Sequence, residues 1–286
     1  MALKTPPEVA QAAVDTGTTK AGLTWDKALV GGFLAGAYIA FGGLVAIAVS
    51  SGLKPETWGT LPTLFSGAVF ALGLVLVVLA GSELLTGNMA LLPLGVLDRR
   101  ITLGRLSFNF FWVLIGNLIG SLFVAYFLAK ETGVVTAPAP LERLGAIATA
   151  KGVTESDWQI FLRAIGCNWL VCLAVWMALG AEDIGGKILA IFFPIMAFVA
   201  MGFDHVVANM FFLPAAIFAH VPDITWGDAI RNWIFAFLGN FVGAGVFVAG
   251  AYWYLYIRGA EPVAGDEPAG PREEVGGRFV HSGTTR

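Results

Sequence analysis

The stretch Met201-Gly-Phe-Asp-His-Val-Val-Ala-Asn-Met210 places an acid, a histidine and an asparagine inside an otherwise apolar run of the sequence. That run extends from about residue 187 to residue 219. A single helix over it would be about 50 Å long, against a bilayer core of roughly 30 Å. Polar groups at that depth are tolerated where the backbone lines a cavity or is buried in protein. We therefore expect a membrane span broken into two half-helices around Gly202, Asp204 and His205.

The composition indicates a membrane protein with several spans. The chain of 286 residues is 57% hydrophobic and 13% charged, whereas a soluble domain carries about 25% charged residues. Its long segments without charge each reach the roughly 18 residues that suffice to cross a bilayer. These segments lie at 28–53, 57–82, 106–129, 164–181 and 232–257. The formal net charge of −3 argues against a nucleic-acid partner, which would require a basic patch.

Hydrophobic periodicity and charge predict an all-α protein with six spans. The spans lie at about 28–50, 62–97, 105–130, 158–180, 187–219 and 230–258. The second span is also too long for one straight helix, and it carries Glu83 between two glycines. The domain organisation is then a six-span membrane domain over 28–258 between two soluble ends. Residues 1–27 contain a short helix over 6–17 that stops at Gly17, and residues 259–286 form a disordered tail.

Basic residues predict the orientation of the spans. They precede the first span, fill the loop between the second and third, and close the last span at Arg258. An excess of Lys and Arg marks cytoplasmic loops, so we expect both termini in the cytoplasm. The loop between the third and fourth spans mixes basic and acidic residues and gives no orientation signal.

The chain contains an internal repeat. Gly81-Ser-Glu-Leu-Leu-Thr-Gly-Asn-Met89 and Gly202–Met210 match in Gly, acid, Asn and Met at identical spacing, and residues 109–120 match residues 232–243 in the same way. Spans 1–3 (about 28–130) thus correspond to spans 4–6 (about 158–258). Because each copy has three spans, the second copy is inverted in the membrane. Inverted repeats with one broken helix each are a transport architecture.

The two asparagines of the breaks can be interpreted in two ways, and the two acids in one. Asn88 and Asn209 are placed to cap the second half-helices, which would aim positive dipole ends at an anion. Alternatively, they only tie the broken backbone together. We interpret Glu83 and Asp204 as structural acids that accept N–H bonds from the broken backbone.

Several other features indicate packing. The pairs Gly116/Gly120 and Gly239/Gly243 have the spacing that lets helices approach closely, within a protomer or between protomers. Cys167 and Cys172 share one helix without metal or disulfide geometry. The two histidines besides His205 lie outside the spans, so the chain has no metal cage, no catalytic triad and no expected cofactor.

These motifs resemble the formate/nitrite transporter family over about residues 5–258. The resemblance is carried by Ala40-Phe-Gly42, Glu83-Leu-Leu-Thr86, residues 167–176 (CNWLVCLAVW) and residues 202–210 (GFDHVVANM). It implies an aquaporin-like six-helix bundle in a homopentamer, with one pore in each protomer, in the cell membrane. It implies transport of formate or nitrite as small anions of weak acids, together with a proton. Hydrosulfide, lactate or acetate, and an aquaporin-like neutral-solute channel, are the alternatives; no arginine of the kind such a channel requires lies in the broken segments.

The resemblance also implies site residues. His205 matches the central pore histidine, Thr86 a threonine that can bond it, and Asn168 a pore-proximal asparagine. Positions of two hydrophobic constrictions match Phe70, Leu74, Leu84 and Phe198, with Leu85 where relatives often have phenylalanine. A weaker match places Lys151 at a vestibule lysine.

The implied pore acts as a dielectric filter. A bare anion loses hydration in an apolar constriction, whereas a neutral acid crosses it. In one interpretation His205 passes the proton; in the other it stays neutral and only donates a hydrogen bond.

Overall fold

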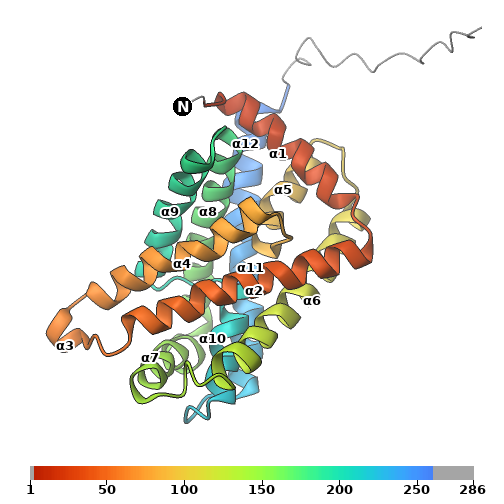
Figure 1. Cartoon of the computed structure of the whole chain (residues 1–286). Helices are drawn as coiled ribbons and strands as arrows, with labels where there is room; N and C mark the ends of the chain where they lie inside the picture. The colour runs from red at the N-terminus through yellow and green to blue at the C-terminus, as the bar shows by residue number, and fades with distance from the viewer. Residues whose placement is uncertain (1–2, 260–286) are drawn as a thin grey trace, which may run out of the picture.

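The computed structural model describes residues 3–259, and the chain over that range is built of helices (Figure 1). In chain order they are α1 (Pro6–Ala21), α2 (Trp25–Ser50), α3 (Pro55–Trp58), α4 (Leu61–Ala80), α5 (Leu85–Leu97), α6 (Leu103–Phe123), η1 (Val124–Lys130), α7 (Pro138–Thr149), η2 (Ala150–Thr154), α8 (Asp157–Gly180), α9 (Ile184–Ala200), α10 (Val206–Phe218), α11 (Trp226–Ala244), η3 (Gly245–Gly250) and α12 (Ala251–Tyr256). The η segments are π-helical and continue the helices before them. Over residues 3–259 the β pairing is confined to an isolated bridge between Leu3 and Ala181. The expected tail lies, apart from Gly259, outside the described residues.

The helices form six crossings. Five runs are long and apolar enough to span a membrane, namely α2, α4, α6 with η1, α8, and α11 with η3 and α12. The fifth crossing in chain order consists of α9 and α10, of 17 and 13 residues. In the second crossing α4 is continued by α5, which has 13 residues. The predicted all-α, multi-pass architecture is confirmed.

Both predicted breaks are present, and a glycine turns the chain at each. α4 ends at Ala80, followed by Gly81 with φ +80°, and α5 begins at Leu85. α9 ends at Ala200, followed by Gly202 with φ +70°, and α10 begins at Val206. An L side chain is unfavourable at such a φ, so glycine allows the chain to leave one half-helix and enter the next.

The Gly-x-x-x-Gly pairs pack inside the protomer. A Cβ on Gly120 of α6 would lie 2.0 Å from the Phe33 carbonyl oxygen of α2. In the other repeat, a Cβ on Gly243 of α11 would lie 2.3 Å from the Ile165 carbonyl oxygen of α8. These distances show that the backbones of α2 and α6 are in contact, and likewise those of α8 and α11. The glycine pairs therefore pack within the protomer, which the sequence alone did not decide.

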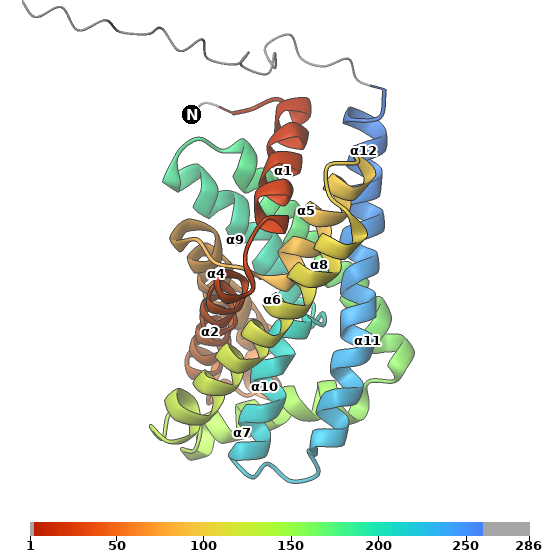
Figure 2. The same cartoon turned by 90° about the vertical axis from the view of Figure 1, so that its right-hand side faces the viewer.

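A helix outside the six crossings precedes the first span of each repeat. α1 packs across α5 and α8 at one end of the molecule, and α7 with η2 packs against α10 and α11 at the other (Figures 1 and 2). The sequence predicted the start of α1 but not its end. The helix continues to Ala21 because Gly17 is a packing residue, with its Cα against the Leu91 carbonyl of α5. The helical fold of the loop between the third and fourth spans was not predicted.

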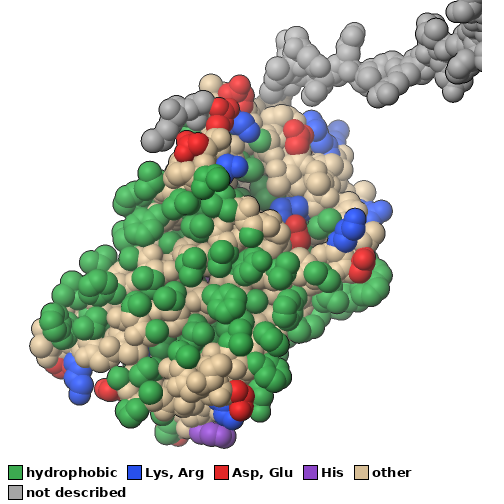
Figure 3. All heavy atoms as spheres, viewed as in Figure 1, with side chains coloured by type: hydrophobic (Ala, Val, Ile, Leu, Met, Phe, Trp, Pro, Cys, Tyr) green, Lys and Arg blue, Asp and Glu red, His purple; other side chains and the backbone are tan. Residues whose placement is uncertain are grey.

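The outer surface is apolar between these two ends. Figure 3 shows hydrophobic side chains over the middle of the molecule and charged ones gathered toward its ends. Large apolar side chains of α6, α9 and α11 are more than half exposed, among them Phe111, Leu189, Phe193 and Ile234. An apolar belt of this kind suits a lipid or protein surround rather than water.

Candidate functional site

An asparagine of the third crossing holds the first break. Asn117 Oδ1 accepts a hydrogen bond from the Leu85 N–H at 3.0 Å, and its Nδ2 donates to the Glu83 carbonyl at 2.9 Å. The same Nδ2 donates to the Gly32 carbonyl of α2 at 2.8 Å. Backbone groups that the missing helical turn would leave unpaired thus find a buried partner.

The second break is held in the same way. Asn240 Oδ1 accepts from the Val206 N–H at 2.9 Å, and its Nδ2 donates to the Asp204 carbonyl at 2.9 Å and the Ala164 carbonyl at 2.8 Å. The sequence contained the signal for this role, because Asn117 and Asn240 occupy matching places in the repeat. We did not assign it from the sequence.

Asn88 and Asn209 do not cap the half-helices, so that prediction is wrong. The N-cap residues are Leu84 and His205, and both asparagines lie one turn farther into the helix. Asn88 Nδ2 donates to Glu83 Oε2 and Asn109 Oδ1, both at 2.9 Å.

Asn209 repeats this arrangement. Its Nδ2 donates to Asp204 Oδ1 and Asn232 Oδ1, both at 2.8 Å. The alternative interpretation, in which the asparagines tie the breaks together, agrees with these contacts, although they bind side chains rather than backbone.

Each acid at a break pairs with a lysine from the preceding soluble segment. Glu83 Oε1 lies 2.6 Å from Lys20 Nζ of α1, and Asp204 Oδ1 lies 3.0 Å from Lys151 Nζ of η2. The acids therefore accept hydrogen bonds from side chains, and not from backbone N–H groups as expected. Sequence reasoning found Lys151 but missed Lys20.

The two lysines are equivalent in the repeat. Asn109 Nδ2 donates to the Lys20 carbonyl at 3.0 Å, and Asn232 Nδ2 donates to the Lys151 carbonyl at 3.1 Å. The repeat thus includes α1 and the α7–η2 segment. An alignment that started before the first span would have matched Lys20 with Lys151.

His205 lies at the centre of the molecule with both ring nitrogens engaged. Nδ1 accepts a hydrogen bond from the Ala208 N–H at 3.1 Å and so caps α10. Nε2 lies 2.8 Å from Thr86 Oγ1 of the first repeat. Because Nδ1 is an acceptor, the hydrogen-bond network assigns the proton of a neutral ring to Nε2, which donates to Thr86.

Two cavities approach this centre from opposite ends. The α7-side cavity, of about 240 Å³, is lined by His205, Phe70 and Phe198 and by Lys151. The α1-side cavity, of about 260 Å³, is lined by Lys20, Glu83, Asn88, Leu74 and Leu84. Asn209 lies on the wall of the first.

An apolar partition separates the two cavities. Phe70 and Leu74 are one turn apart on α4, and they line the α7-side and the α1-side cavity respectively. The Phe70 and Phe198 rings meet edge to face with centroids 5.8 Å apart. Phe70, Leu74, Leu84 and Phe198 are each at most 3% exposed.

Four predicted site residues line neither cavity and are fully buried, namely Thr86, Leu85, Asn168 and Asp204. Leu85 is fully buried as the first residue of α5. Asn168 is fully buried on α8, and its Nδ2 donates to the Thr86 carbonyl at 3.1 Å and the Asn240 carbonyl at 2.9 Å. Asn168 therefore positions the residue that bonds His205 rather than lining either cavity.

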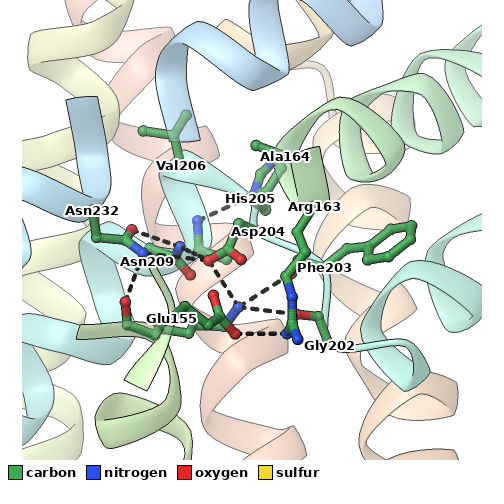
Figure 4. A network of polar contacts seen from close by, with 12 residues as sticks. Glu155, Arg163, Ala164, Gly202, Phe203, Asp204, His205, Val206, Asn209 and Asn232 are labelled. Carbon is green, nitrogen blue, oxygen red and sulfur yellow. Dashed lines mark hydrogen bonds and ion pairs between the residues drawn. The ribbon is translucent and has the colours of Figure 1, made fainter. Parts of the chain in front are cut away.

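The α7-side cavity carries charged residues that sequence reasoning missed. Arg143 of α7 lines it and donates to Ser50 Oγ at 2.9 Å and Ser66 Oγ at 3.2 Å. Glu155 and Arg163 also line it and pair with each other at 2.7 Å (Figure 4). Arg143 and Glu155 were missed because no fold was predicted for the segment between the third and fourth spans, and Arg163 was missed because it lies within the predicted fourth span.

Comparison with known families and proteins gives one consistent result. A family model described as formate/nitrite transporter matches residues 7–254. The uncharacterized transporter YrhG of Bacillus subtilis is 50% identical over 256 residues, which cover 90% of this chain and 95% of that protein. A probable formate transporter of Methanothermobacter thermautotrophicus is 47% identical, and the match covers 89% of this chain and 98% of that protein. The formate channel BtFdhC of Bacillus thuringiensis is 44% identical, covering 90% and 97%.

Solved structures agree with these relatives. An FNT family ion channel superposes with a TM-score of 0.81 at 33% identity, covering 87% of this chain and 98% of that chain. A pentameric formate channel with formate bound superposes with a TM-score of 0.72 at 31% identity, covering 81% and 97%.

Proposed function

The chain belongs to the formate/nitrite transporter family, and we propose that it carries formate across the membrane as a weak acid, with nitrite as the alternative substrate. The observation that carries this proposal is the pair of cavities on either side of an apolar partition, with His205 on the wall of the α7-side cavity and Thr86 hydrogen-bonded to it. Relatives described as a probable formate transporter and a formate channel support formate as the first substrate to test.

Charge brings the anion to the partition. Arg143, Lys151 and Arg163 give the α7-side cavity three cationic side chains against the carboxylates of Glu155 and Asp204. A small anion is attracted into such a cavity, where low-dielectric walls strengthen the field. Lys20 on the α1-side provides a cation at the other end of the path.

The partition then admits only a neutral species. A formate ion between Phe70, Phe198 and Leu74 would lose its hydration without replacement, which costs several kcal/mol or more. Formate that takes up one proton becomes formic acid and crosses without that cost. On the far side the acid releases the proton to water, so that one anion and one proton cross together.

The contacts of His205 favour the interpretation in which the ring stays neutral. A proton on Nδ1 would break the bond from the Ala208 N–H and remove the cap of α10. The neutral ring and Thr86 instead present a hydrogen-bond pair to a small acid at the partition. The proton is then taken from water in the cavity, and His205 orients the acid as it crosses.

A flux measurement tests this function. Purified protein in proteoliposomes is loaded with labelled formate, and exchange is followed against formate, nitrite, hydrosulfide, lactate and chloride at pH 6 and pH 8. We expect exchange with formate and nitrite, faster at pH 6, and little exchange with chloride, which forms no neutral weak acid. Formate exchange no faster than in protein-free liposomes would overturn the proposal, and glycerol or water flux without anion flux would favour the neutral-solute alternative.

We extend the proposal to orientation and localisation. Basic residues near α1, including Arg99 and Arg100 after α5, support a cytoplasmic position for that end in the cell membrane. Cysteines introduced singly at Lys54 and Asp223 should then react with an impermeant thiol reagent added to intact cells, and one at Arg99 should not. Both native cysteines are buried and give a low background. Labelling of the Arg99 cysteine from outside would reverse the orientation.

We also propose a homopentamer with one path in each protomer. The neighbouring structure described as a pentameric formate channel supports this assembly, and the apolar outer face offers surface for it. Native mass spectrometry in detergent should give the mass of five chains, each of 30.2 kDa. A stable monomer or tetramer would contradict it.

A further inference from the structure

Two buried carboxyl groups at the α7-side cavity each have one oxygen without a partner. Among residues 3–259, Glu155 Oε2 and Asp204 Oδ2 receive no hydrogen bond. The other oxygens are engaged, Glu155 Oε1 with Arg163 at 2.7 Å and Asp204 Oδ1 with Lys151 at 3.0 Å. Glu155 is 5% exposed and Asp204 is fully buried. A buried oxygen left without a donor is destabilising, and more so when it is charged.

The two carboxyl groups lie against each other. Glu155 directly follows η2, Asp204 lies in the break between α9 and α10, and their side chains are near enough to hydrogen-bond when one of them carries a proton. Figure 4 draws Glu155 and Asp204 in one polar network, in which Glu155 is joined to Arg163. Two ionised carboxylates in contact repel, and one proton between them replaces that repulsion with a hydrogen bond.

We propose that Glu155 and Asp204 share one proton, and that this proton sets the net charge of the α7-side cavity and with it the cavity's affinity for small anions. The proton resides on Glu155 Oε2 and is donated to Asp204 Oδ2, so one proton satisfies both unpartnered oxygens. This proposal rests on the proposed function, because it names a regulation of the same anion path.

The surroundings of Glu155 bring the pKa of its carboxyl group near neutral pH. Burial is the main cause that raises the pKa of Glu155 to about 7, and the negative charge of Asp204 raises it further. Lys151 and Arg163 act in the opposite direction but do not cancel these effects. The carboxyl thus changes its charge over the range in which a weak-acid transporter experiences pH changes.

Charged and titratable groups face the pair from every neighbouring element. They are Lys151 from η2, Arg143 from α7, Arg163 and the buried thiol of Cys167 from α8, His205 from the break, and Arg231 from α11. Arg231 donates a hydrogen bond to the Glu155 carbonyl at 2.8 Å and forms an ion pair with Asp157. With both acids ionised, the three cations at the cavity exceed the two carboxylates by one charge. A shared proton raises that excess to two.

The consequence is a cavity that binds anions more tightly when it is protonated. One added positive charge several ångströms from a bound anion changes affinity by about 3- to 10-fold at an intermediate dielectric. The anion and the proton favour each other's binding, which suits a path that moves both. Among residues 3–259, Glu83 is the one acid that lines the α1-side cavity, and both of its carboxylate oxygens are bonded.

The test is the pH dependence of the apparent KM for formate exchange, with the same pH on both sides of the proteoliposome. Glu155→Gln keeps the shape of the side chain and can donate a hydrogen bond to Asp204 Oδ2. Because glutamine does not titrate, the variant keeps the neutral charge of protonated Glu155 at every pH. We expect variant and wild type to have similar KM at pH 5.5, and the wild-type KM to exceed that of the variant about 3- to 10-fold at pH 8. The maximal rates should change much less. A wild type-to-variant KM ratio that is constant with pH would overturn the proposal.

A matched control separates the site from general surface charge. Glu142→Gln removes the same group from an exposed position on α7, and its KM should follow wild type at every pH. If Glu142→Gln behaves like Glu155→Gln, the effect is a surface potential and the shared proton is rejected.

A second measurement does not depend on transport. Infrared difference spectra of the wild-type protein between pH 5.5 and pH 8 should contain the C=O band of a buried protonated carboxyl, and Glu155→Gln should lack it. A wild type without that band overturns the proposal even if the variant fails to assemble. If the band is present but the wild type carries no formate or nitrite, the proposed function has failed and the shared proton has not.

Discussion

Thr86 of α5 and His205 at the start of α10 form one hydrogen bond, Oγ1 to Nε2 at 2.8 Å, that joins the two breaks. Thr86 belongs to the first repeat and His205 to the second, so the bond lies on the line where the two inverted halves meet. The backbone of Thr86 is held in turn by Asn168, and the ring of His205 by the Ala208 N–H.

Substitution of His205 distinguishes a neutral ring from a proton carrier. His205→Phe should assemble but lose most weak-acid flux, because it keeps bulk and removes both the cap and the Nε2 donor. His205→Asn retains an N-cap acceptor and a donor, so flux should persist with the wild-type pH profile if the ring is neutral. Thr86→Val should fall between them. Flux is measured from pH 5 to pH 8.

Two results would contradict this account. A flattened pH profile in His205→Asn would show that the imidazole carries the proton. Wild-type flux and pH profile in His205→Phe would reduce His205 to a packing residue.

The double variant Phe70→Ala with Phe198→Ala should admit larger or more hydrated anions. The two rings meet edge to face at 5.8 Å, and their removal widens the apolar partition and lowers its dehydration barrier. Lactate and chloride exchange should rise several-fold. Phe193→Ala, on the exposed face of α9, is the control and should leave selectivity unchanged. Unchanged lactate and chloride exchange in a well-assembled double variant would place the filter elsewhere.

Asn117→Ala and Asn240→Ala should destabilise the fold to a similar degree. Each removes three hydrogen bonds, including those to the first N–H of the second half-helix and to the carbonyl of the acid in the break. At about 1–3 kcal/mol for each unsatisfied group, both variants should lose several kcal/mol. Thermal unfolding in detergent provides the comparison, with Gln11→Ala in α1 as control. A loss confined to one of the two variants would show that the breaks are not equivalent.

The raised pKa of Glu155 predicts that the stability of the folded protein falls as pH rises. An unfolded glutamate titrates near pH 4.3, and burial raises the pKa of folded Glu155 to about 7. Between these values the folded state binds more protons than the unfolded state, so this contribution to stability falls as pH rises. The unfolding temperature of the wild type should fall by a few degrees relative to Glu155→Gln between pH 5 and pH 8, on the order expected for a change of 1–2 kcal/mol. Parallel curves for the two proteins would contradict the raised pKa.

The sequence predicted the six crossings and both breaks because charge and glycine recur at the same spacing in long apolar runs. It did not distinguish a cap from a position one turn inside a helix, and so Asn88 and Asn209 were misplaced. Lys20 was missed because the repeat was compared only within the spans, although its partner contacts match those of Lys151. Glu155 was not predictable, since its role depends on a π-helical turn that brings it to Asp204.

The inclusion of α1 and the α7–η2 segment in the repeat has a kinetic consequence. A solute meets a lysine, an acid, an asparagine and an apolar partition in the same order whichever end it enters. Under the proposed function, net flow then follows the gradients of anion and proton in either direction. Among the described residues, Arg143, Glu155 and Arg163 line the α7-side cavity and have no counterpart in the lining of the α1-side cavity. Under the shared-proton proposal the two mouths therefore differ in their sensitivity to acid, and the compartment that the α7-side cavity faces is the one whose pH adjusts the rate.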